Sequence, residues 1–193
     1  LPSETIKGGI GINIPLAIYL MGVCMTIILT GISYYRMLKL IHSISPEVRE
    51  GLKIRIVEHE IASFSWGRNI VISKSDYEEN PEILKHETMH VRCGHSIDLL
   101  AYTAISVVHW FNPLVWVMFI IFNRDIELAC DEAVVSQAGH SSRKAYAMAL
   151  IDMEEKRSLS GTLYTCFNRN AIEERIVAIM KIKRPTLIRL GVS

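Results

Sequence analysis

The longest uncharged stretch of the chain, residues 8–35, is predominantly apolar. An α-helix needs about 20 apolar residues to cross the hydrocarbon core of a bilayer, so this stretch can cross with some tilt. Asn13 and Pro15 near its start indicate the membrane interface, and the helix proper is expected from about Pro15 to Tyr35. The pattern favours a transmembrane helix over the alternative, a helix buried in a soluble core.

Two shorter patterns after this stretch predict strands. Residues 53–58 alternate polar and apolar side chains, which is the period of a half-buried strand. A turn at residues 63–67 leads into a second predicted strand at residues 69–73. The sequence Ser-Pro-Glu at residues 45–47 resembles a helix start, so a short helical turn is expected there, ending near residue 51.

A second uncharged run covers residues 99–123. Asn-Pro at residues 112–113 is a strong helix start, so two helices are expected. The first covers about residues 98–110, and the second runs from Pro113 to near Gln137. Each apolar piece is short for a complete crossing. The apolar hairpin of residues 98–123 either dips into the membrane or packs against the first helix, and both interpretations stay open.

Three further segments predict amphipathic helices. Asn80 and Pro81 are typical of a helix start and Gly94 of a helix end, so residues 80–93 predict one helix. The other two are expected at residues 142–157 and from Asn170 onward, with apolar faces that include Tyr146, Leu150 and Met153 in one and Ile172, Ile176, Ile179 and Met180 in the other. Basic residues at 181–184 are typical of a cytoplasmic membrane flank.

The first of these helices contains the sequence His-Glu-Thr-Met-His at residues 86–90, the HExxH pattern of zinc peptidases. Residues four apart share a helix face, so His86 and His90 can bind one zinc ion. Glu87 lies about 100° further round the helix, where it can take a proton from a zinc-activated water. The alternative is a helix that merely carries two histidines.

A catalytic zinc ion usually has three protein ligands and one open position. Glu127 is the best candidate for the third, since a carboxylate at the end of an apolar helix is costly to bury without a partner. Asp131 shares its helix face and is expected to hold a ligand histidine. His109 is a candidate for oxyanion or site support, although a lone histidine in an apolar run is more often a core residue. Cys130 could offer a thiolate, but a buried, reduced thiol is the favoured interpretation.

A strand near the metal is the candidate for substrate binding. In zinc peptidases of this type an edge strand pairs with the extended substrate through main-chain hydrogen bonds. The stretch of residues 64–72 is expected to fill that role, with Ile70, Val71 and Ile72 as the pairing residues. An ordinary hairpin explains the same pattern.

Composition and charge narrow the class of protein. Of the 193 residues 50% are hydrophobic, and the formal net charge of +1 gives no sign of a nucleic-acid surface, so no direct nucleic-acid partner is expected. The 4 cysteines form no CxxC pair. Basic residues follow the first apolar stretch at positions 36, 39, 49, 53 and 55, which places the N-terminus outside and the zinc helix in the cytoplasm.

Three segments carry a resemblance to a known family: HETMH at residues 86–90, HWFNPLVW at residues 109–116 and ELACDEAVV at residues 127–135. With further similarity at residues 142–150 and 174–176, the chain resembles the BlaR/MecR-type antirepressor metallopeptidases over most of its length. The resemblance implies an α+β, mainly helical fold, in which a gluzincin-like zinc metallopeptidase domain with a small sheet is attached to a transmembrane helix and a further apolar helical hairpin.

The resemblance also implies roles for residues. The zinc ligands of the family correspond to His86, His90 and Glu127, its catalytic glutamate to Glu87, and the aspartate of its ExxxD element to Asp131. The implied function is a membrane-embedded zinc endopeptidase with one Zn²⁺ ion, of a signal-transducing antirepressor type, which cleaves itself or a cytoplasmic repressor. The alternatives are a CAAX-processing or quality-control membrane metalloprotease and a non-catalytic signalling scaffold with a structural zinc site.

The family suggests a bacterial membrane protein that is multi-pass at full length, with its site facing the cytoplasm. Residues 1–40 are then the extracytoplasmic end and transmembrane helix, residues 41–185 the cytoplasmic peptidase domain with its hairpin at 98–123, and residues 186–193 the start of a following segment. The expected partners are a protein or peptide substrate, the lipid bilayer and an extracellular sensor domain elsewhere in a longer chain. The family also suggests a role in antibiotic resistance, whereas β-lactam sensing does not follow from these residues.

Overall fold

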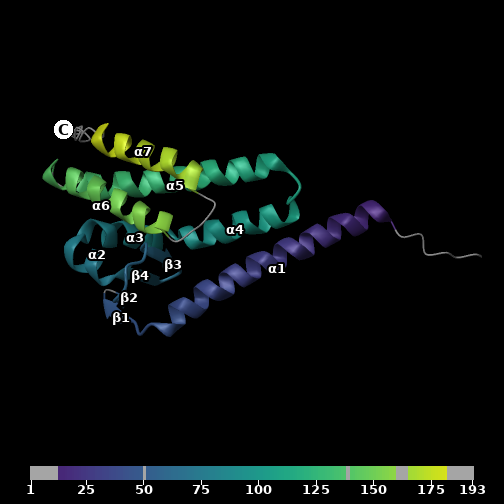
Figure 1. Cartoon of the computed structure of the whole chain (residues 1–193), viewed down its shortest axis with the longest axis horizontal. Helices are drawn as coiled ribbons and strands as arrows, with labels where there is room; N and C mark the ends of the chain where they lie inside the picture. Colours follow the sequence, from purple (N-terminus) through teal and green to yellow (C-terminus); the bar gives the residue numbers. More distant parts are fainter. Residues whose placement is uncertain (1–12, 50, 138–139, 160–164, 182–193) are drawn as a thin grey trace, which may run out of the picture.

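The computed structural model describes residues 13–49, 51–137, 140–159 and 165–181. In Figure 1 a long N-terminal helix leads to a small sheet, and the later helices stack beside that sheet. The elements in chain order are α1 (Ile14–Ser43), β1 (Glu47–Arg49), β2 (Leu52–Val57), β3 (Phe64–Trp66), β4 (Asn69–Ser73), α2 (Lys74–Glu79), α3 (Pro81–Cys93), α4 (His95–Val108), α5 (Pro113–Gln137), α6 (His140–Leu159) and α7 (Thr165–Lys181). The fold is therefore mainly helical with a small mixed sheet, as expected.

Helix α1 is, among the described residues, the one helix long and apolar enough to cross a membrane. Its apolar side chains are largely exposed, which fits a helix that faces lipid. The helix continues to Ser43, beyond the predicted end at Tyr35. The extension has a packing reason, because Ile41 is buried against Val57 and Val71 of the sheet.

The sheet has the strand order β1-β2-β4-β3. Strands β2 and β4 pair in parallel, and β1 and β3 each pair antiparallel with their neighbour. The strands predicted at residues 53–58 and 69–73 are confirmed as β2 and β4. The helical turn predicted at residues 45–51 is wrong, because residues 47–49 form β1 and Gly51, at a φ of 76°, turns the chain back into β2.

The prediction that Ile70, Val71 and Ile72 pair with substrate is wrong. All three lie in β4, which is hydrogen-bonded to β2 on one side and β3 on the other, and all three are fully buried. An interior strand has no free edge to offer a second chain. The edges of the sheet are β1 and β3. Strand β3, residues 64–66, lies inside the predicted stretch of residues 64–72 and forms an ordinary hairpin with β4.

Helix α3 carries the HExxH sequence and lies between the sheet and the helices α5 and α6. It begins at Pro81 and is closed by Gly94 at a φ of 73°, as predicted. Asn80 occupies the N-cap position, but its side chain donates a hydrogen bond to Oδ1 of Asp76 instead of capping α3. The main hydrophobic core lies around this helix and includes Ile54, Ile72, Ile83, Val134, Val135, Leu150, Met153 and Ile179.

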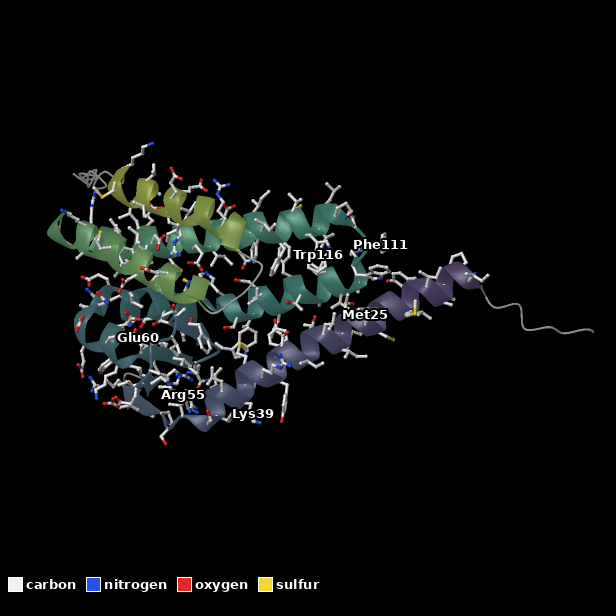
Figure 2. The ribbon with its side chains drawn as sticks, in the orientation of Figure 1. Met25, Lys39, Arg55, Glu60, Phe111 and Trp116 are labelled. Carbon is white, nitrogen blue, oxygen red and sulfur yellow. The ribbon has the colours of Figure 1, made fainter. Side chains whose placement is uncertain are left out.

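Helices α4 and α5 form the expected apolar hairpin, which projects in the same direction as the N-terminal part of α1 (Figure 1). The tip packs on α1. A Cβ atom added to Gly22 would lie 2.2 Å from ring carbons of Trp110, so the two segments approach closely only because position 22 is glycine. Figure 2 shows Met25 on α1, and Phe111 and Trp116 in the hairpin, in the part of the molecule that projects away from Arg55 and Glu60.

The last two described helices, α6 and α7, are confirmed, although both begin before their predicted starts. Helix α7 packs on α5 and α6, on the side of the molecule away from the sheet (Figure 1). The expectations for the basic positions 183 and 184 and for residues 186–193 lie outside the described residues.

Candidate active site and metal centre

Helices α3 and α5 bring His86, His90 and Glu127 together. The two Nε2 atoms of the histidines are 3.0 Å apart, and the carboxylate oxygens of Glu127 lie 3.3 Å from Nε2 of His86 and 3.6 Å from Nε2 of His90. Tetrahedral coordination at about 2.0–2.1 Å separates ligand atoms by roughly 3.3 Å. The three side chains therefore fit a single zinc-sized ion without rearrangement.

The hydrogen bonds around His86 decide which of its ring nitrogens can bind a metal. The hydroxyl of Tyr146 donates its single proton to Oδ1 of Asp131 at 2.5 Å and lies 2.8 Å from Nδ1 of His86. With its proton committed, the hydroxyl oxygen can only accept from an Nδ1–H of His86. When the ring is neutral, this tautomer leaves the lone pair of Nε2 pointing at the other two ligands.

His90 has a different partner. Its Nδ1 lies 3.0 Å from Nδ1 of His95, and the sulfur of Cys130 lies 3.7 Å from the same His95 nitrogen. The sequence did not indicate His95, because it follows His90 by five residues and lacks the four-residue ligand spacing. Gly94 brings His95 to the site, because the left-handed conformation of Gly94 folds His95, the first residue of α4, back beside His90. His90, His95 and Cys130 consequently form a second group whose ligand atoms could hold a metal.

The charges around the ligands are tightly coupled. Burial lowers the pKa of His86, but hydrogen bonds with Asp131 and Glu127 outweigh burial and raise this pKa to about 9. Burial, followed by the nearby His86, lowers the pKa of His90 to about 4. Burial also opposes ionisation of Glu127, yet its hydrogen bond with His86 and the charge of Arg175 hold the pKa of this carboxyl far below its usual range. Near neutral pH Glu127 is therefore an anion that faces a protonated His86 and a neutral His90.

Besides His95, two further contributors to the site were not predicted from the sequence, Arg175 and Tyr146. Arg175 on α7 donates two hydrogen bonds to Asp131, at 2.7 and 2.8 Å, and its NH1 lies 3.0 Å from Glu127. The sequence contains one indication that Arg175 is buried, because position 175 falls on the apolar face of its helix, between Ile172 and Ile179. A charged residue on such a face needs a buried partner. Tyr146 gave no comparable signal and was assigned to the apolar face of α6.

A cleft of about 160 Å³ opens beside the ligands. Glu87 lines it together with His90 and Glu127, and the edge strand β3 forms another part of its wall through Phe64, Ser65 and Trp66. The rest of the lining is supplied by His95, Ser96, Leu99, Asn123 and Ile126. The cleft thus joins the expected general base, two candidate metal ligands and a strand that can accept a partner strand.

His109 is not brought to this cleft. It follows α4, whose 14 residues begin at His95 beside the ligands and end at Val108. At a rise of 1.5 Å per residue the helix separates the two histidines by about 20 Å. The structure therefore does not support the predicted role of His109 in the site.

The comparison with protein families decides the identity of this arrangement. A family model described as the BlaR1 peptidase M56 matches residues 65–179, a span that contains most of β3, all three candidate ligands and Arg175. The chain belongs to the M56 peptidase family. This confirms the resemblance drawn from the sequence, and it makes the protein a membrane-associated metallopeptidase of the BlaR1 type that acts on a protein substrate. A search of curated proteins finds none that matches the chain.

The ligand assignment predicts a graded loss of metal affinity in this M56 peptidase. Glu127→Ala should lose much of the affinity for Zn²⁺, and Asp131→Ala should weaken it by about 10–100-fold, because Asp131 orients a ligand instead of binding. Competition with a chromophoric chelator measures both. Asp125→Ala is the matched control, since Asp125 is exposed on the same helix. Normal zinc binding by Glu127→Ala would contradict its place as third ligand.

Proposed function

We propose that this M56 peptidase is a gluzincin-like zinc endopeptidase that uses His86, His90 and Glu127 as metal ligands. The observation that carries the proposal is the ligand spacing of 3.0–3.6 Å beside a cleft that Glu87 lines. Two imidazoles and one carboxylate are a common donor set of catalytic zinc, which keeps one position open for water or substrate. A zinc ion bound there would polarise the scissile carbonyl and lower the pKa of the attacking water.

Side chains of this protein carry out the proton transfer and orient the metal ligands. Glu87 accepts the proton of the attacking water and later delivers it to the leaving amine, which is the general acid–base role. Its position one residue after His86 keeps its carboxyl in the same cleft as the ligands. Asp131 and Tyr146 hold His86 in the tautomer that exposes Nε2. His95 contacts Nδ1 of His90, the nitrogen of that ring that does not face the other ligands.

The edge strand β3 is the proposed substrate platform. Phe64, Ser65 and Trp66 line the cleft, and β3 pairs with β4 on only one side. An extended peptide can add to the other side through main-chain hydrogen bonds, with its side chains in the cleft. The proposed substrate is the peptidase itself or a cytoplasmic repressor, as for an antirepressor.

Membrane helices reach this platform directly. The ring of Tyr34 on α1 lies 5.1 Å from the ring of Trp66, and its hydroxyl lies 3.2 Å from Oγ1 of Thr103 on α4. A shift between α1 and α4 would therefore act on β3 without an intermediate. This contact supports the proposal that the peptidase responds to a signal received outside the membrane.

The proposed topology places α1 across the membrane, the N-terminus outside and the zinc site in the cytoplasm, because the basic residues cluster after the apolar stretch. The α4–α5 hairpin is proposed to enter the bilayer beside α1, which would make the protein multi-pass. Its support is the exposure of Phe111, Leu114 and Met118, at 60%, 69% and 58%, in the part of the hairpin that projects alongside α1.

A closed structural zinc site is the alternative with an observation in its favour, since His95 and Cys130 lie next to His90. A structural site has four protein ligands and no open position. The cleft beside Glu87 favours the catalytic interpretation.

Glu87→Gln separates these two functions. The variant should keep its zinc but lose most cleavage of casein and of the chain itself, because glutamine cannot accept the water's proton. Glu82→Gln, the same change in the first turn of the same helix, should cleave normally. Retained zinc with unchanged cleavage in Glu87→Gln would refute the enzyme mechanism.

The topology predicts the labelling of single cysteines introduced at positions 5 and 45 of a chain whose native cysteines are replaced. An impermeant thiol reagent added to intact cells should label Thr5→Cys and should label Ser45→Cys only after permeabilisation, because α1 lies between the two positions. The opposite pattern would place the zinc site outside the cell and remove cytoplasmic substrates.

A further inference from the structure

We propose that Arg175 is a positioning residue of the metal site, which holds Glu127 and Asp131 at once and makes metal binding depend on helix α7. The inference rests on the proposed function, because it takes Glu127 as a metal ligand. It assigns to α7 a role at the site that neither HExxH nor ExxxD contains.

The guanidinium of Arg175 contacts each carboxylate with different nitrogens. Nε and NH2 donate to the two oxygens of Asp131 at 2.7 and 2.8 Å, a bidentate pair, while NH1 lies 3.0 Å from Oε2 of Glu127. The same Oε2 faces Nε2 of His86 at 3.3 Å. Arg175 therefore fixes the oxygen that completes the ligand triangle and, through Asp131, the histidine across from it.

Burial makes this contact specific. Arg175 is 6% exposed and Asp131 is 1% exposed, so neither charge can turn to solvent when the other is missing. A planar guanidinium offers five N–H groups in a rigid fork, which suits two carboxylates held at a fixed angle. A lysine ammonium would supply the charge but not the fork.

Charge and orientation predict opposite effects on metal affinity. A guanidinium so close to the ligands repels a divalent cation, so a role limited to charge neutralisation predicts tighter metal binding once the guanidinium is removed. Orientation predicts weaker binding, because Glu127 and Asp131 would repel each other and leave their present positions. We expect orientation to dominate, since the two carboxylates already outnumber the single guanidinium charge.

The position of α7 gives the contact a wider consequence. This helix packs on α5 and α6, and Ile179 anchors it in the main core. A displacement of α7 would withdraw Arg175 from Glu127 and Asp131 together. The affinity of the site for its metal would then depend on the position of α7.

The test compares three variants of the full chain by their affinity for Zn²⁺ and by the visible spectrum of bound Co²⁺. Arg175→Ala should weaken zinc binding by about 10–100-fold and change the cobalt spectrum. Arg175→Lys should also bind more weakly than the wild type, because it lacks the fork. Arg124→Ala removes the exposed ion pair between α5 and Glu174 on α7 and should change neither measurement.

Unchanged or tighter zinc binding in Arg175→Ala would overturn the inference, and so would wild-type affinity in Arg175→Lys. Thermal unfolding without metal shows whether each variant folds. If Arg175→Ala does not fold, the zinc affinity of Arg175→Lys tests the inference. A wild-type chain that binds no zinc would instead refute the proposed function, so the two failures are distinguishable.

Discussion

The rest of the site depends on the hydrogen bonds that the buried carboxylate of Asp131 accepts. It accepts hydrogen bonds from Tyr146 on α6 and from Arg175 on α7, and it lies 3.2 Å from Nδ1 of His86 on α3. A buried anion is costly unless it is paired and hydrogen-bonded, so Asp131 forces three helices to converge on α5. The metal ligands are then held by the same contacts that pack the helices.

A second constraint joins the site to α1 and to the apolar α4–α5 hairpin. Gly94 closes α3 and starts α4, so the residue that contacts His90 also begins the apolar hairpin. On the other side of the cleft, Trp66 of the edge strand contacts Tyr34 of α1. The cleft therefore lies where the sheet, the hairpin and the candidate membrane span meet. A movement of α1 or of the hairpin would therefore change a wall of the proposed active site.

Local signals predicted most of the elements. HExxH, the terminal Pro81 and Gly94, and the long apolar stretch each depend on residues close in the chain, and the corresponding helices were confirmed. The failures share a different cause. Strand order placed β3, and not Ile70–Ile72, at an edge of the sheet, and pairing with β2 made residues 47–49 a strand. Arg175 and Tyr146 reach the site through contacts between distant helices, which neither periodicity nor spacing reports.

The coordination of the bound metal tests the account most directly. X-ray absorption at the zinc K-edge of the zinc-loaded chain should show only nitrogen and oxygen neighbours at about 2.0–2.2 Å, from two imidazoles, one carboxylate and a solvent molecule. A sulfur neighbour at about 2.3 Å would contradict the account. It would place Cys130 at the metal and favour a closed structural site around His90 and His95.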